Sequence, residues 1–258
     1  MKRVCIISII FILLSSAYIG STVISKHNTL GKVQQTQFAF QKTSSFIDES
    51  NIMHVYGEVR NLSNNAMQNV VIKASFYDSN GKLINQFERS SDIRTINPGQ
   101  ISPFEILYID TKSVNNVKNY TLSATGQETK IKQRELKIIS NSSKLDLLGV
   151  YYIAGRVMNE GSQDTTNSMI IATLYDKDGR VIVVGRAQTE PVNISSHTEA
   201  AFDLPVTEQL QTYKVKSYSL AADSNQYVTV PEFSHLTATV LLVLMFTIII
   251  TIDKIKHT

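Results

Sequence analysis

The sequence predicts an all-β protein: two tandem β-sandwich domains, flanked at the N- and C-terminal ends by hydrophobic membrane helices. Three observations lead to this prediction. Val, Ile, Thr, Tyr and Phe recur in short bursts, whereas helix-long amphipathic runs are few and Trp is absent; these residue types favour strands. The chain repeats itself without a gap after 98 residues. Each end carries an apolar run that contains no charge.

The composition is that of a globular protein with room for two ordinary domains. The chain has 258 residues, of which 43% are hydrophobic and 18% charged, and its formal net charge is +3. Between the two charged ends, 21 Lys and Arg stand against 20 Asp and Glu. The middle of the chain therefore lacks the basic surface with which proteins bind nucleic acid, and we expect no nucleic-acid partner.

Residues 1–25 have the pattern of a signal peptide or an N-terminal membrane helix. Lys2 and Arg3 precede an apolar run over residues 4–14, which small residues follow. A cut after Ala17 fits this pattern, whereas the apolar character that continues through Ile24 leaves an uncleaved anchor open. The only cysteine, Cys5, lies in this run, so the domains form no internal disulfide and depend on their cores alone.

Residues 231–258 have the pattern of a C-terminal transmembrane or sorting segment. Residues 236–252 contain no charge over 17 positions, the short end of what spans a bilayer. Lys254 and Lys256 make the tail cationic, and cationic tails stay on the cytoplasmic side. Both ends therefore predict a protein of the cell membrane, with an extracellular ectodomain and a cytoplasmic C-terminal tail unless the segment is processed.

The middle of the chain is an internal repeat. A shift of 98 residues aligns 38–124 with 136–222 without a gap, and twenty of the 87 columns are identical. Identical pairs include Gly57/Gly155, Asn61/Asn159 and Phe104/Phe202. A unit this long is expected to have its own core. We therefore predict two copies of one domain, at residues 32–127 and 128–226.

Each copy alternates apolar and polar residues in short runs that indicate strands. The first set is 54–60 with 152–158, the second 70–77 with 168–175, and the third 120–124 with 218–222. Between them, Asp78 and Gly81, with Asp176 and Gly179, predict a bulged hairpin: Asp accepts backbone hydrogen bonds and Gly takes a positive φ. Strands at this spacing fit an immunoglobulin-like sandwich.

The repeated pattern Gly57-x-Val59-x-Asn61 followed by Tyr77-Asp78-x-x-Gly81 resembles the FxLYD family of extracytoplasmic β-sandwich domains. The first Phe of the family's name is replaced by Ala74 and, in the second copy, by Ala172. This resemblance implies no catalytic activity and no settled ligand.

The residues before the second apolar run resemble a second family. Pro231, Glu232 and Phe233, followed by that run and a basic tail, are similar to the PEF-type C-terminal sorting signals of archaeal surface proteins. The resemblance implies that an archaeosortase-like processing enzyme removes the tail and transfers the protein to another anchor. Ser234 stands where many members have Gly or Pro, and a plain single-span anchor explains everything in the segment except the three motif residues.

Few residues are candidates for chemistry. Asp176 and Asp178 could form a loose calcium site, but an EF-hand register would place Leu174 and Gly185 at ligand positions. The hairpin turn explains both acids without a metal. The five histidines show no paired spacing, and nucleophile and nucleotide motifs are absent. We expect no catalysis, no cofactor and no metal.

Four asparagines stand in acceptor triplets for glycosylation, about as many as chance predicts in a chain rich in Asn, Ser and Thr. Asn141 and Asn193 are the better candidates; Asn61 and Asn119 complete the set. Asn61 aligns with Asn159, which is not in a triplet, and a repeated turn hydrogen bond explains that pair. We expect the repeated aromatics Tyr77/Tyr175 and Phe104/Phe202 to pack in the cores.

Two functions remain open from the sequence. The first is a membrane-anchored cell-surface protein that displays two interaction modules to envelope components or protein partners, for which exposed strand edges offer a route. The alternative is a ligand- or metal-binding accessory subunit of an envelope enzyme or transporter.

Overall fold

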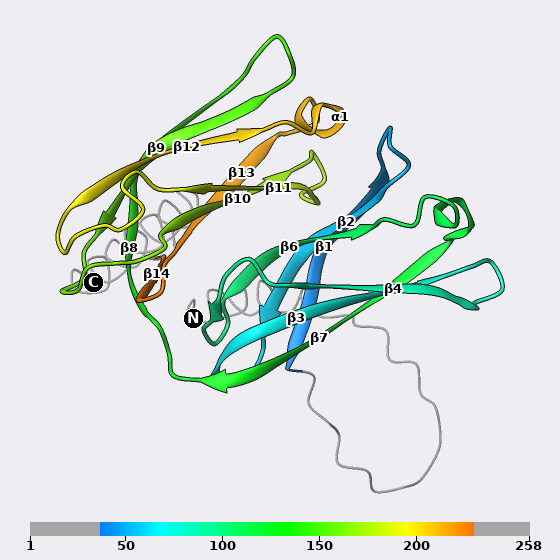
Figure 1. The fold of residues 1–258 in the computed structure, drawn as a ribbon, viewed down its shortest axis with the longest axis horizontal. Helices are drawn as coiled ribbons and strands as arrows, with labels where there is room; N and C mark the ends of the chain where they lie inside the picture. The colour runs from blue at the N-terminus through cyan, green and yellow to red at the C-terminus, as the bar shows by residue number, and fades with distance from the viewer. Residues whose placement is uncertain (1–36, 230–258) are drawn as a thin grey trace, which may run out of the picture. The chain divides into compact units, whose positions relative to one another are not determined.

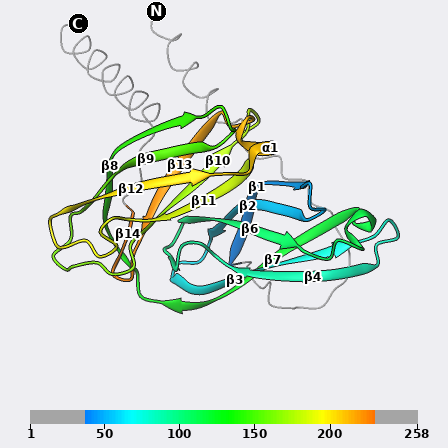
Figure 2. The ribbon, with the colours of Figure 1, turned by 45° about the horizontal axis from the view of Figure 1, so that its top comes forward.

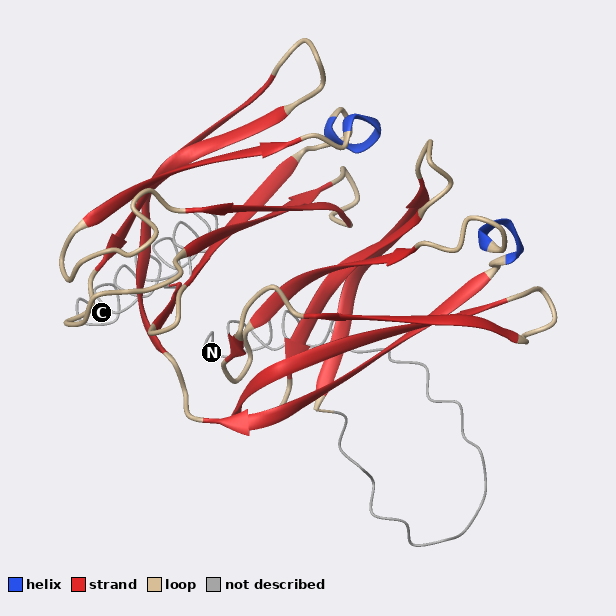
Figure 3. Ribbon diagram, viewed as in Figure 1, coloured by secondary structure: helices blue, strands red, loops and turns tan. Residues whose placement is uncertain are grey.

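The computed structural model describes residues 37–229, and these form an all-β fold with several sheets (Figures 1 and 3). The expected segments 1–25 and 231–258 lie outside the described residues. In the described part, helical structure is confined to a 3-10 turn, η1 (Val114–Asn116), and one short helix, α1 (Gln209–Thr212). No helix within residues 37–229 is long and apolar enough to cross a bilayer.

The first repeat contains two antiparallel sheets. One has the strand order β1-β2-β6; in the other, β3 lies between β4 and β5 and also pairs with β7. The strands are β1 (Phe38–Ile47), β2 (Met53–Asn61), β3 (Ala66–Tyr77), β4 (Leu83–Ser90), β5 (Thr95–Ile96), β6 (Ile101–Tyr108) and β7 (Asn119–Thr129). Residues 130–132 then link β7 to the second repeat, just beyond the boundary expected at 127/128.

The second repeat forms one seven-stranded sheet, in the order β11-β10-β13-β14-β8-β9-β12 (Figure 2). The short strand β14 pairs antiparallel with β13 and parallel with β8, so it connects what are two separate sheets in the first repeat. The strands are β8 (Gln133–Leu145), β9 (Tyr151–Asn159), β10 (Met169–Tyr175), β11 (Val181–Gln188), β12 (Glu199–Val206), β13 (Ser217–Asp223) and β14 (Tyr227–Thr229).

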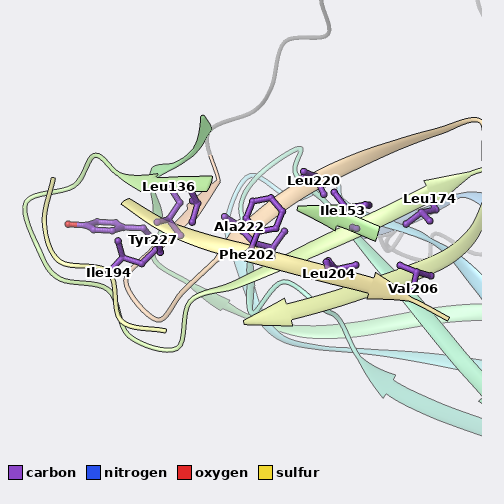
Figure 4. Packing of buried hydrophobic residues seen from close by; sticks show 14 of the residues in the cluster. Leu136, Ile153, Leu174, Ile194, Phe202, Leu204, Val206, Leu220, Ala222 and Tyr227 are labelled. Atoms are coloured by element: carbon purple, nitrogen blue, oxygen red, sulfur yellow. The ribbon is translucent and has the colours of Figure 1, made fainter. Parts of the chain in front are cut away.

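Each repeat has its own hydrophobic cluster. In the first repeat both sheets contribute to it, and in the second repeat both sets of strands that β14 connects contribute. The alternation predicted for β3 and β10 is confirmed: Ile72, Ala74 and Phe76 are fully buried, as are their second-repeat counterparts. Figure 4 shows Phe202 of the second cluster among the labelled side chains of Ala222 and Leu220. Burial of this kind contributes about 25 cal/mol per Å² of apolar surface and is the main force that holds each repeat together.

The predicted hairpins are also confirmed. In each repeat the first Asp of the turn accepts backbone N–H bonds through its Oδ1 atom, at 2.8–2.9 Å, and the Gly has a φ of +75°. The strand register shifts beside the turn, between Phe76 and Tyr77 and between Leu174 and Tyr175. A register shift of one residue is what a bulged hairpin requires.

The repeated Gly57 and Gly155 leave room for an aromatic ring on the neighbouring strand. Gly57 lies opposite Phe104 and Gly155 opposite Phe202. A Cβ atom at Gly57 would lie 2.8 Å from Cζ of Phe104; at Gly155 it would lie 2.6 Å from Cζ of Phe202 and 2.2 Å from the carbonyl oxygen of Ser140. A glycine in mid-strand normally weakens a sheet. Here the ring of Phe104 or Phe202 fills the space that a side chain at the glycine would occupy.

We expect Gly155→Ala to lower the free energy of unfolding by about 1–3 kcal/mol, because the new methyl group overlaps both a ring and the backbone of β8. Urea unfolding of the variant measures this. Ala154→Ser, an exposed neighbour on β9, is the control and should change stability by less than about 0.5 kcal/mol. Equal stability of Gly155→Ala and the parent would contradict the packing described for Phe202.

Candidate functional site

The junction between the two repeats holds a connected group of polar and charged side chains. All described residues belong to one compact unit. A third hydrophobic cluster joins Tyr56 and Ile93 of the first repeat to residues of the second, and Phe46 packs against it. The contributions from the second repeat are Ile171, Tyr175, Val181, Val184 and Val228. We call these residues the junction cluster.

The junction uses different faces of the two copies, and the sequence differs accordingly. On β2, Tyr56 and Glu58 are buried at the junction, whereas the equivalent residues of β9, Ala154 and Arg156, are exposed. The opposite holds for β10 and β11. Their junction residues Ile171, Val184 and Arg186 replace Lys73, Gln86 and Glu88 of the first repeat. Positions that differ between the copies therefore mark the contact.

Tyr175 links the copies through Glu58. Its hydroxyl donates to Oε1 of Glu58 at 2.6 Å, and the ammonium of Lys42 lies 4.5 Å from the centre of its ring. Burial, together with the bond to the Glu58 carboxylate, raises the pKa of the Tyr175 hydroxyl. The expectation that Tyr77 and Tyr175 pack in the cores is confirmed for Tyr175, which is buried in the core cluster at the junction, and is wrong for Tyr77, which is half-exposed. For Phe104 and Phe202 the expectation is confirmed.

A network of six charged side chains also lies at the junction. Arg186 of the second repeat reaches Asp92 with Nε and with Nη2, the latter 2.8 Å from Oδ2, and its Nη1 lies 3.6 Å from Glu105. Arg89 lies within 4 Å of the same two carboxylates. Asp48 and His54 complete the charge network. With His54 protonated, three cations balance three anions.

His54 is held between two carboxylates. Its Nδ1 lies 3.0 Å from Oε1 of Glu105, its Nε2 lies 3.4 Å from Oδ2 of Asp48, and the Tyr56 hydroxyl is 3.1 Å from Nδ1. Burial opposes protonation, but the hydrogen bonds and charges of Glu105 and Asp48 outweigh it and raise the pKa of His54. Burial likewise opposes ionisation of Glu105, yet His54, Tyr56 and Arg186 hold the pKa of that carboxyl below its usual value.

A cleft of about 340 Å³ opens beside His54, with walls from both repeats. Its charged lining residues are acidic apart from His54. The lining is Phe46, Asp48, Glu49, Ser50, His54, Thr207, Glu208, Gln209 and Leu210. Both ring nitrogens of His54 face carboxylates, so neither is free to take a proton from Ser50 as a general base would. Asp48, Glu49 and Glu208 make the lining predominantly anionic.

The linker between the repeats is fixed by a second polar contact. Asp223 is fully buried; it pairs with Lys132 of the linker at 2.9 Å and with Arg94 of the first repeat at 3.0 Å. Asn97 binds both backbone groups of Lys132, at 2.8 and 3.0 Å. Every buried side-chain nitrogen and oxygen atom in residues 37–229 has a hydrogen-bond partner, so the junction carries no uncompensated polar group.

The residues that the sequence offered as a metal site are engaged in the hairpin. Oδ2 of Asp176 accepts from Nε of Arg180 at 2.9 Å, and Oδ2 of Asp178 accepts from Nη2 of Arg180 at 3.1 Å. Across the described residues, no group of three or more His, Cys, Asp or Glu side chains is arranged to hold a metal ion.

The glycosylation candidates differ in exposure. Asn119, Asn141 and Asn193 are exposed. Asn61 is fully buried, and its Nδ2 donates to the carbonyl groups of Asn65 and Ile96 at 2.8 Å. Asn159 makes the matching bonds in the second repeat. The repeated turn bond predicted for this pair is therefore confirmed, and Asn61 has no nitrogen free for a glycan. Pro231, Glu232 and Phe233 lie outside the described residues.

Sequence reasoning missed the junction residues. Single histidines and arginines carry no spacing signal, and identity between the copies reveals only the residues that both copies share. The signal lay in the columns where they differ, such as Glu88/Arg186 and Glu58/Arg156.

The similarity of this chain to known proteins is weak. The chain matches no protein-family model and no curated protein. Among solved structures, it is similar to the exo-chitosanase CsxA of Amycolatopsis orientalis at 10% identity and a TM-score of 0.27, over 74% of this chain and 26% of that one. Red sea bream transglutaminase gives 7% identity and a TM-score of 0.23, over 75% and 32%. The chain thus spans about a quarter to a third of the length of these enzymes.

We expect Arg186→Glu to lower the free energy of unfolding by about 3 kcal/mol, because it removes the arginine that binds Asp92 most closely and adds a third negative charge beside Asp92 and Glu105. The reverse exchange, Glu88→Arg, is the matched control at the equivalent position. It disrupts only an exposed pair with Lys73 and should cost less than about 1 kcal/mol. Equal effects of the two exchanges in urea unfolding would contradict the role given to Arg186.

The raised pKa of His54 predicts a pH-dependent contribution to stability. The imidazolium is stabilised in the folded state, so its contribution is complete below the unfolded value of 6.5 and is lost as the pH rises through the higher folded pKa. The stability difference between the parent and His54→Gln should therefore be largest near pH 6 and shrink above it, by about 1 kcal/mol in all.

Urea unfolding at a series of pH values, starting from about pH 5, measures this difference. Glu105 and Asp48, whose pKa values are lowered, lose their contributions only below that range. A difference that is constant with pH would rule out the proposed imidazolium.

Proposed function

We propose that this protein is a non-catalytic, membrane-anchored cell-surface protein that displays two β-sandwich interaction modules to envelope components or protein partners. The observation that carries the proposal is the junction. An apolar cluster, a balanced charge network and a clamped linker hold the two repeats in one fixed arrangement. A fixed arrangement of two modules suits presentation at a surface, where a flexible linker would leave their relative placement undefined.

The proposal includes the finer architecture. Each repeat would be an immunoglobulin-like sandwich of the FxLYD type, with domains close to 32–127 and 128–226. It is supported by cores to which both sheets contribute in the first repeat and by strand pairs that recur 98 residues apart.

Placement at the membrane rests on the two ends of the sequence. Residues 1–25 would be a signal peptide or an N-terminal membrane helix, and residues 231–258 a transmembrane segment or an archaeal sorting signal read at Pro231, Glu232 and Phe233 by an archaeosortase-like enzyme. The ectodomain would face the outside, where Asn119, Asn141 and Asn193 are exposed to glycosylation.

Intact mass of the protein from native membranes, with and without deglycosylation, tests this proposal. We expect loss of the residues before about position 18, because signal peptidases cut after small residues. We also expect loss of residues 231–258 with added anchor mass, and glycan on exposed asparagines. A full-length mass without glycan would contradict both the signal peptide and the sorting signal.

A second candidate, a ligand-binding accessory subunit, is favoured by the cleft beside His54. Its lining combines the acids Asp48, Glu49 and Glu208 with the apolar residues Phe46 and Leu210, which suits an organic cation better than a metal ion. Thermal unfolding with added polyamines would show a rise in midpoint if this candidate holds, and elemental analysis of the purified protein tests bound metal directly.

A further inference from the structure

The turn between β8 and β9 presents two leucines to solvent. Leu147 is 100% exposed and Leu148 is 72% exposed, at the end of a long hairpin. Soluble proteins expose single apolar residues often, but two adjacent leucines at a turn tip form a projecting apolar point. We call this pair the leucine tip.

The backbone of this turn does not need leucine. Asp146 closes it by accepting from the backbone N–H of Val150 at 2.8 Å and from that of Leu148 at 2.9 Å. In the first repeat Asp48 closes the equivalent turn in the same way, accepting from Ile52 at 2.8 Å. There the tip residues are Glu49 and Ser50, both exposed. The same turn therefore forms with polar residues, so turn formation does not explain the leucines.

The surroundings of the leucine tip match a lipid surface. Tyr213, 60% exposed, lies against Gly149 of the turn, and Thr212 donates to the Gly149 carbonyl oxygen at 2.6 Å. Two exposed lysines lie close in the sequence: Lys144 shortly before the turn, and Lys214 directly after Tyr213. Leucine at the point, with tyrosine and lysine behind it, is the composition of segments that enter the headgroup region of a bilayer.

The last described strand runs parallel to β8. β14 pairs parallel with β8, so the chain at Thr229 runs toward the β8–β9 turn. Residues 230–235 can extend by at most about 20 Å before the run begins. From Leu136, opposite Thr229, to Leu145, β8 covers about 30 Å in the same direction. Along this direction the tip extends farther than residues 230–235 can, so it reaches a bilayer that the following run enters along β8.

We propose that Leu147 and Leu148 insert into the outer leaflet of the bilayer that holds the protein, and so fix the orientation of the second repeat on the membrane. This rests on the proposed anchoring at residues 236–252 or at an anchor attached in their place. A convex tip of two side chains is far smaller than the roughly 1,000 Å² that a stable protein interface buries, whereas a bilayer accommodates a convex point.

The absence of Trp from the natural sequence makes a direct test available. Leu147→Trp in the full chain, reconstituted into phosphatidylcholine–phosphatidylglycerol vesicles, carries a single indole at the tip. Glu49→Trp places the indole on the equivalent turn of the first repeat and is the matched control. Both positions are exposed, so neither change should disturb folding.

We expect the emission of Leu147→Trp to shift to shorter wavelength in vesicles and to lose most of its intensity when the lipids are brominated near the headgroup end of their chains. Penetration of about 5–10 Å places the indole at that depth. Glu49→Trp should keep a water-like, unquenched emission.

Vesicle flotation separates this inference from the proposed function. Failure of the parent protein to float with the vesicles would overturn the anchoring itself. Flotation with a water-like, unquenched Leu147→Trp signal would leave the anchoring intact and overturn the leucine tip. A blue shift without bromine quenching, growing with protein density in the membrane, would identify a second copy as the occupant and also overturn it.

Discussion

The contact between Arg186 and the carboxylates of Asp92 and Glu105 determines how the two repeats meet. Two copies of one repeat could meet in many ways, because their exposed sheet faces have similar shapes. The apolar junction cluster provides driving force but little direction. A buried charge requires its partners in one geometry, since leaving it unpaired costs several kcal/mol. We infer that the charge network selects the arrangement and the junction cluster stabilises it.

The same logic explains why the outer faces of the two repeats differ from the faces that meet at the junction. The junction joins different faces of the two copies, and such heterologous contacts can continue indefinitely unless the outer faces prevent it. The unused face of the first repeat carries the exposed pair Lys73–Glu88, and that of the second carries Arg156–Glu199. Lys73 and Gln86 stand in the first repeat where the junction has Ile171 and Val184, and Ala154 stands in the second where the junction has Tyr56. Ile171, Val184 and Tyr56 thus occur only where a partner covers them.

The sequence predicted the strands, the hairpins and the repeat because these depend on local alternation and on register within one copy. Ile72, Phe104 and Asn61 have the same environment in both copies, and identity revealed them. The junction depends on which outer faces meet, and this information lies in differences such as Glu88/Arg186. It could not be separated from neutral variation in a single sequence. The joining strand β14 was also missed, since three residues carry no periodicity.

The charge network also gives His54, which lines the cleft, a structural role. A general base needs a free ring nitrogen and a pKa near the working pH. In His54 both nitrogens face carboxylates, and those carboxylates raise the pKa by favouring the imidazolium. A proton held this firmly serves to link Asp48 to Glu105 and, through Glu105, to Arg186 of the other repeat. The histidine therefore belongs to the junction, and the cleft beside it offers Glu49 and Glu208 as acids that the network does not use.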